Sequence, residues 1–299
     1  MKILKDKLSF LFVWGIYLIL RRRSLNTRIR VTLIIAFFIY LLSKKIRERI
    51  KRNILLIRPD LTNRQVSQYA WQVVKTIAHS WAAMLGNKFL RKEEIPRIVE
   101  VQGAEPVLRC YGEGKKVIIT GVHIGPVDRT FAGIALYRLP FYIPVEAIKP
   151  KWLLDFMMRL RLQFGDIIFE EVERGETIPR AARYLSEGRV VILVVDTTVR
   201  GNTGVLCRIG KAQIRFPVGP VKLALEEDAT IFPIIPSWRE DGKAIAAIGP
   251  PFELIRTGDE KKDIETNTRR LIEEIYGPHI IANLSSWQSL PRLVVKRAL

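Results

Sequence analysis

A histidine and an aspartate five positions apart are the residues of this sequence best suited to proton transfer. His123 comes soon after the apolar run Val117–Thr120, and Asp128 follows after a Gly and a Pro. We predict that a buried strand fixes the backbone near His123 and that Asp128 lies in the first turn of the next helix. Its carboxylate would then bond one ring nitrogen, leaving the other nitrogen to take a proton from a hydroxyl. The His-x4-Asp spacing alone also occurs around structural histidines.

A second carboxylate ends a second apolar run. Asp196 follows Val190–Val195 and precedes Arg200 in a loop bracketed by glycines. This aspartate can cap the next turn, or it can contact a polar acceptor or the base. The sequence leaves these alternatives open.

Short apolar runs alternate with helical segments from residue 116 onward. This pattern predicts an α/β fold with a mostly parallel central sheet flanked by helices. The predicted strands are Val117–Thr120, Phe141–Val145, Ile167–Glu170, Val190–Asp196, Ile231–Ile235 and Ala244–Ile248. Reactive groups in such sheets gather beyond the carboxyl ends of the strands, where both His123 and Asp196 fall.

The positive charge is concentrated near the amino terminus. The chain has 299 residues and a net charge of +19, and residues 1–52 hold 14 basic and 2 acidic side chains. Two apolar runs, Leu8–Leu20 and Ile29–Leu42, lie between the basic clusters. Each run is shorter than the ~20 residues that cross a bilayer, so we predict helices in the membrane interface or a shallow re-entrant pair. Basic flanks favour the anionic cytoplasmic leaflet.

Two other interpretations of this segment are weaker. A buried helical hairpin would leave its basic residues with few acidic partners, and apolar runs between basic clusters do not suit nucleic acid binding.

The cysteines, Cys110 and Cys207, are far apart, and the three histidines are scattered, so no zinc spacing exists. We therefore predict a membrane lipid as partner, no nucleic acid and no metal.

An amphipathic helix after residue 149 carries further basic residues. Lys149, Arg159 and Arg161 lie along Lys149–Phe164, among apolar side chains. The helix either exposes a solvated basic face or contacts a phosphate or an acyl carrier beside the active site.

Taken together, these segments resemble the bacterial glycolipid acyltransferases: the lauroyl/myristoyl acyltransferases of lipid A biosynthesis and the phosphatidylinositol mannoside acyltransferase. The resemblance covers nearly the whole chain. It includes the blocks Arg52–Pro59, Gly121–Asp128, Arg159–Arg161, Gly188–Asp196 and Arg208–Pro233, and the region of Trp287. The family usually has Asn before the His and Trp before the acid, where this chain has Val122 and Val127.

The resemblance implies a membrane-anchoring segment at 1–52 and an acyltransferase domain at 53–299, at the cytoplasmic face of the inner membrane. His123, oriented by Asp128, would deprotonate a glycolipid hydroxyl that attacks an acyl carrier protein or coenzyme A thioester, with no other cofactor. Backbone N–H groups around Gly125 or a basic side chain would stabilise the oxyanion. The resemblance also gives substrate-binding roles. Arg159 and Arg161 would position substrate, Asp196 would hold the acceptor headgroup, and the remaining candidates are Lys149 and Arg200.

Three alternatives remain. Lysophospholipid and glycerol-phosphate acyltransferases share His-x4-Asp, but their Phe-Pro-Glu-Gly block does not occur here. An inactive lipid-binding relative would show the same segments without turnover. The third alternative is a hydrolase that uses the same His, but this sequence has no serine in a Gly-x-Ser-x-Gly elbow.

Overall fold

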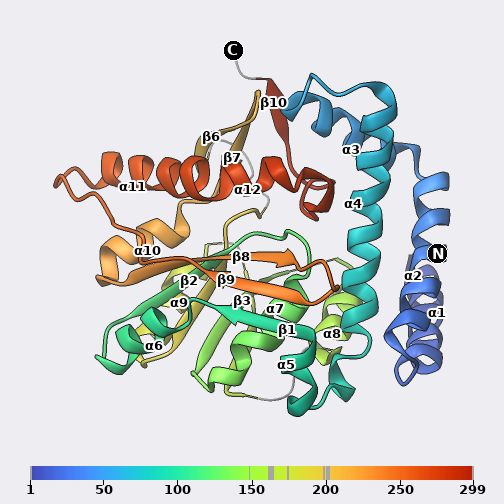
Figure 1. Cartoon of the computed structure of the whole chain (residues 1–299), viewed down its shortest axis with the longest axis horizontal. Helices are drawn as coiled ribbons and strands as arrows, with labels where there is room; N and C mark the ends of the chain where they lie inside the picture. Colours follow the sequence, from blue (N-terminus) through green and yellow to red (C-terminus); the bar gives the residue numbers. More distant parts are fainter. Residues whose placement is uncertain are drawn as a thin grey trace.

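A seven-stranded sheet forms the centre of the protein, in the order β1-β9-β8-β2-β5-β3-β4 (Figure 1). The computed structural model describes residues 2–147, 149–160, 165–173, 175–197, 199 and 203–297. The strands of this sheet are β1 (Val99–Gln102), β2 (Val117–Gly121), β3 (Phe141–Glu146), β4 (Ile167–Val172), β5 (Val190–Val194), β8 (Thr230–Trp238) and β9 (Ala244–Ile248). All six predicted strands are present.

The sheet is mostly parallel, which confirms the predicted fold class. Five neighbouring strands, from β8 to β4, run in one direction, while β9 is antiparallel to β8 and β1 is parallel to β9. The five residues of β2 are buried, as expected for a strand covered on both faces.

Successive residues of the central strands enter different cores. Ile118, Tyr142 and Val191 belong to one buried cluster, and their neighbours Ile119 and Phe141 belong to another. This alternation follows from the two-residue period of a strand. The first cluster is completed by α3 (Lys44–Ile57), α4 (Asn63–Met84), α9 (Thr177–Ser186) and α10 (Gly219–Glu227). The second is completed by α5 (Ile95–Ile98), α6 (Glu105–Gly112) and α7 (Val127–Ile134).

Twelve α-helices lie in the part of the chain that the structure describes. They are α1 (Lys2–Leu20), α2 (Leu25–Leu42), α3 (Lys44–Ile57), α4 (Asn63–Met84), α5 (Ile95–Ile98), α6 (Glu105–Gly112), α7 (Val127–Ile134), α8 (Lys151–Leu160), α9 (Thr177–Ser186), α10 (Gly219–Glu227), α11 (Glu260–Arg269) and α12 (Gly277–Ala282). Thr62 caps α4 in a capping box with Gln65, so the start of this helix is fixed by its own sequence.

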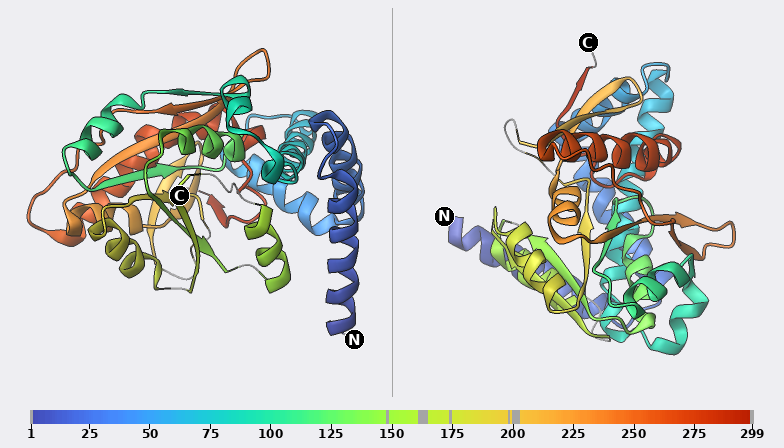
Figure 2. Two further views of the ribbon diagram at one scale, coloured as in Figure 1. Left: turned by 90° about the horizontal axis from the view of Figure 1, so that it is seen from below. Right: turned by 90° about the vertical axis from the view of Figure 1, so that its left-hand side faces the viewer.

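The two amino-terminal helices stand at one edge of the molecule, beyond α4 (Figures 1 and 2). α2 packs along α4, while α1 contacts α8 through aromatic pairs such as Phe10–Trp152 and Tyr17–Phe156. Among the described residues, Leu25–Leu42 is long and apolar enough to cross a membrane, and 6% of it is buried. The helices are longer than the apolar runs because polar residues at their ends are also helical.

α3 connects this edge to the rest of the protein. Ile50, Ile54 and Ile57 are fully buried in the first core. Asn53 is buried too, and its side-chain amide donates to the carbonyls of Leu290 and Leu293. The boundary predicted at residue 52 therefore falls inside a helix that packs into the first core.

Several elements near the carboxyl terminus were not anticipated from the sequence. β6 (Val205–Ile209) and β7 (Ala212–Phe216) form a hairpin that pairs with β10 (Val295–Arg297) in a small second sheet. α11 continues directly into a π-helix, η4 (Arg270–Tyr276). Tyr276 is buried, and its hydroxyl lies 2.6 Å from the carbonyl of Thr120 on β2.

Candidate active site

The site begins where two neighbouring parallel strands end. β2 pairs with β5 in a register that places Gly121 beside Val194. Two residues beyond each of these positions stand His123 and Asp196. The sheet therefore delivers both side chains to one edge, as predicted for the carboxyl ends of parallel strands.

His123 and Asp196 are bonded to each other twice. The ring nitrogen Nδ1 of His123 lies 2.7 Å from Oδ1 of Asp196, and the backbone N–H of His123 donates to Oδ2 at 2.9 Å. The Asp196 side chain has no exposed surface, whereas that of His123 is 29% exposed. The pair therefore has a buried carboxylate and a histidine that reaches solvent.

Burial and hydrogen bonding act in opposite directions on Asp196. Burial alone would raise the pKa of its carboxyl group, but the charge of His123 and the hydrogen bonds from His123 and Trp287 lower the pKa below its ordinary value. An ionised carboxylate only accepts hydrogen bonds, so Nδ1 of His123 must carry the proton. Nε2 then keeps its lone pair and can accept a proton.

A carboxyl-terminal segment, residues 286–289, holds this pair in place. The indole N–H of Trp287 donates to Oδ2 of Asp196 at 2.7 Å, and the hydroxyl of Ser289 lies 3.3 Å from Nδ1 of His123. The backbone N–H of Gln288 donates to the carbonyl of His123, and its side-chain amide donates to the carbonyl of Gly125. Trp287 is fully buried. The histidine loop is thus fixed by a segment more than 160 residues away in sequence.

The sequence predicts that the carboxylate of Asp128 orients the ring of His123. In the structure, the carboxylate paired with Nδ1 of His123 is that of Asp196. Gly125 has a φ of +58° and Pro126 precedes α7, so the chain turns and Asp128 becomes the second residue of that helix. Asp128 borders a small cavity behind the loop instead. Of the alternatives left open for Asp196, the geometry selects contact with the histidine.

The other predicted site residues are not gathered around His123 in the part of the chain that the structure describes. Lys149 is exposed just before α8, and Arg159 is exposed in its last turn. No described hydrogen bond or ion pair joins either of them to His123 or Asp196. Arg161 and Arg200 lie outside the described residues.

Two backbone N–H groups next to His123 already have partners. The N–H of Gly125 donates to the carbonyl of Ser286, and the N–H of Val127 donates to the carbonyl of Gly125. Pro126 has no N–H. Stabilisation of the oxyanion by other N–H groups of this loop or by a basic side chain stays a prediction.

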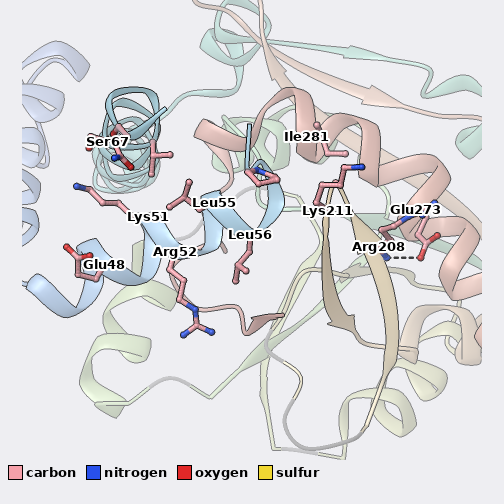
Figure 3. A pocket seen from close by; sticks show the side chains of 14 residues that line it. Glu48, Lys51, Arg52, Leu55, Leu56, Ser67, Arg208, Lys211, Glu273 and Ile281 are labelled. Atoms are coloured by element: carbon pink, nitrogen blue, oxygen red, sulfur yellow. Dashed lines mark hydrogen bonds between the residues drawn. The ribbon is translucent and has the colours of Figure 1, made fainter. Parts of the chain in front are cut away.

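A broad groove of about 1230 Å³ lies between α3, the start of α4 and the β6–β7 turn (Figure 3). Its lining includes the basic residues Lys51, Arg52, Arg208 and Lys211 and the apolar residues Leu55, Leu56 and Ile281. Neither His123 nor Asp196 lines it, so this groove is separate from the proton-transfer pair. Among the described residues there is also no group of three or more His, Cys, Asp or Glu side chains arranged to hold a metal ion.

Sequence comparison identifies the family. The model of the bacterial lipid A biosynthesis acyltransferases matches residues 2–293, nearly the whole chain. The protein belongs to this family. It is therefore an acyltransferase, and the predicted resemblance is confirmed at the level of the family.

Curated protein sequences contain no match to this acyltransferase. Among solved structures, the crystal structure of a 1-acyl-sn-glycerophosphate acyltransferase from Thermotoga maritima is similar to it. The similarity covers 85% of this chain and 98% of that chain, with 13% sequence identity and a TM-score of 0.36.

Proposed function

We propose that this acyltransferase is membrane-associated and transfers a fatty acyl group from a thioester of acyl carrier protein or coenzyme A to a hydroxyl of a glycolipid. The observation that carries the mechanism is the 2.7 Å contact between Nδ1 of His123 and the buried carboxylate of Asp196. It supports the assignment of His123 as general base and of Asp196 as the residue that orients it.

The reaction needs only one proton carrier. Nε2 of His123 takes the proton of the acceptor hydroxyl while the oxygen forms a bond to the thioester carbonyl carbon. Asp196 stabilises the imidazolium that results. The tetrahedral intermediate then collapses, the carbon–sulfur bond breaks, and the imidazolium returns its proton to the leaving thiolate. The products are an ester and a free thiol, and the enzyme forms no covalent intermediate.

Membrane association is supported by the apolar surface of the first two helices. Leu11 and Phe12 on α1 and Phe38 and Leu42 on α2 are each more than half exposed. Exposed apolar patches of this kind are unusual in soluble monomers. The Arg21–Arg23 cluster lies between the two helices and suits anionic headgroups. We therefore propose that this edge rests on the cytoplasmic face of the inner membrane.

The test is acyl transfer by the full-length protein in non-ionic detergent, with labelled acyl carrier protein and coenzyme A thioesters. Labelled glycolipid formed by the wild type and lost in His123→Ala supports the proposal. Free fatty acid in the absence of acceptor would identify a hydrolase. Lipid binding without turnover would identify an inactive relative, and transfer only to lysophospholipid would identify the glycerophospholipid branch.

A further inference from the structure

A small cavity of about 80 Å³ lies behind the histidine loop. α2 and α4 form one side, and Gly125, Pro126 and the first residues of α7 form the other. Trp238 and Ser286 complete the lining. The cavity is therefore built between the helix with the exposed apolar surface and the loop that carries His123.

The cavity is bordered by a half-buried cation. The Arg129 guanidinium lies 5.0 Å from the ring centre of Trp238, and its Nη1 donates to the carbonyl of Gly242 at 3.2 Å. Neither partner carries a net charge, and burial lowers the pKa of Arg129. A guanidinium that loses solvent without gaining an anion is costly, so an anion at this place would be stabilised.

A second cation, Arg28, does not line the cavity itself but interacts electrostatically with Arg129. Nη1 of Arg28, on α2, is 3.4 Å from the carbonyl of Ala83, which lines the cavity. The Arg28 guanidinium rests on Gly86, where a Cβ atom would come within 1.4 Å of Nη1, so its position is tightly defined. Its Nε is buried and has no hydrogen-bond partner. Within the described ranges, no carboxylate forms an ion pair with Arg28 or Arg129.

Polar side chains of α4 face the same cavity. His79, Thr76 and Ser80 line it, and burial together with the charges of Lys75 and Arg129 lowers the pKa of His79. The hydroxyl of Thr76 already donates to the carbonyl of Gln72, so the neutral imidazole of His79 and the hydroxyl of Ser80 are the groups that can donate to an oxyanion without adding charge. A volume of about 80 Å³ suits a single tetrahedral group.

Asp128 limits the charge of the occupant. This residue borders the cavity from the loop side. A carboxylate would repel the second negative charge of a phosphate monoester more than the single charge of a diester. The site therefore favours a group with one negative charge.

We propose that this cavity binds the phosphodiester of a phospholipid-type headgroup. Arg129 and Arg28 supply the positive charge, and α4 supplies neutral donors. The lipid is favoured over the phosphodiester of an acyl carrier because α2, which forms one wall, exposes Phe38 and Leu42 farther along the same helix. The site lies beside the catalytic loop and does not depend on His123 acting as a base.

The test is calorimetric titration of the full-length protein in non-ionic detergent with dihexanoyl phosphatidylglycerol below its micelle concentration. Arg129→Gln and Arg28→Gln should each weaken binding at least tenfold. Arg189→Gln is the matched control, because Arg189 is also partly buried but lies just before β5 and is paired with Asp166. Equal binding by wild type and Arg129→Gln, or an equal loss in the control, would overturn the proposal.

Three additions separate this proposal from its alternatives. Dimethyl phosphate should compete with the lipid, and failure to compete would show that the acyl chains alone account for binding. If Arg129→Gln weakens coenzyme A binding but leaves the lipid unaffected, the site serves the donor and the lipid assignment is wrong. His123→Ala should bind the lipid as the wild type does, so a failure of the catalytic proposal and a failure of this site give different results. Arg28 lies on another helix, which keeps the test valid if Arg129→Gln unfolds.

Discussion

The two ends of the segment from His123 to Arg129 differ in whether their charged side chains have charged partners. At the first end, His123 and Asp196 satisfy each other, and Trp287 and Ser289 supply further hydrogen bonds. At the other end, Arg129 is half-buried with a carbonyl and an aromatic ring as its described partners. The first end is paired without a ligand, whereas the proposed anion would give the second end a charged partner.

This difference matches the two tasks of a transferase. A general base must be held in one geometry and one tautomer before substrate binds, because reorganisation during the reaction raises the barrier. A binding site can leave its charge uncompensated, since the ligand itself supplies the counter-charge. Substitutions at each end can test whether the His123–Asp196 pair accounts for the chemistry. They can also test whether Asp128, beside Arg129, contributes less to it.

Replacing the base should have the largest effect. We expect His123→Ala to lower kcat by about 10⁴-fold, because no other group at the site takes the acceptor proton. Steady-state acyl transfer measures this, and a thermal melt should show that the variant remains folded. Activity within tenfold of the wild type would show that another group acts as the base.

The next effect concerns the carboxylate. Oδ2 of Asp196 accepts two N–H groups, so the oxygen of an asparagine would occupy that position in Asp196→Asn. The amide NH₂ would then face Nδ1 of His123 and donate to it. This inverts the tautomer and places the proton on Nε2, where it blocks the base, so kcat should fall by about 10³-fold. An Asp196→Asn enzyme with unchanged kcat would show that Asp196 serves only the fold.

The same pair predicts how stability depends on pH. The pKa of Asp196 is lower in the folded protein than in the unfolded chain, so its contribution is fully present above about pH 4 and is lost as the pH falls through the folded-state value. Protonated Asp196 resembles asparagine. The difference in Tm between wild type and Asp196→Asn should therefore be present at pH 5 and shrink below pH 4. A difference that grows in acid would contradict the lowered pKa.

Much of this site could be predicted from the sequence. The apolar runs that end near His123 and Asp196 identify two buried strands, and parallel neighbours place the residues beyond their carboxyl ends at one edge of the sheet. Which carboxylate meets the ring depends on register and on the turn at Gly125, since the pairing of Gly121 with Val194 aligns His123 with Asp196. The spacing in the sequence favours Asp128, because it reports separation along the chain and carries no information on which strands pair.

The segment containing Trp287 could not be placed in the same way. It is 91 residues from Asp196 and lies in no periodic pattern, so its position depends on how α11, η4 and α12 pack. The β6–β7 hairpin, by contrast, has a local sequence pattern. Gly210 and Lys211 separate two short alternating runs, which is typical of a two-residue hairpin turn.

Removing the indole N–H should have a smaller effect than changing the carboxylate. Trp287→Phe keeps a ring in the buried position but takes one charge-assisted hydrogen bond from Oδ2 of Asp196. We expect kcat to fall by about 10- to 100-fold with KM nearly unchanged, because the carboxylate is less firmly oriented. The proton on Nδ1 of His123 should also shift upfield in the NMR spectrum. Trp71→Phe on α4 is the control, and it should change neither quantity.

The smallest effect should come from the aspartate of the His-x4-Asp motif. Because Nδ1 of His123 is paired with Asp196, Asp128→Asn leaves the base, its tautomer and its orienting carboxylate in place. We expect kcat to fall by about tenfold or less, far below the effect of Asp196→Asn. Asp128 also borders the cationic cavity, so losing its negative charge should tighten binding of dihexanoyl phosphatidylglycerol. A loss of kcat as large as that of Asp196→Asn would show that the two ends of the loop act as one catalytic unit. Tighter lipid binding with kcat largely retained would show that they are separate.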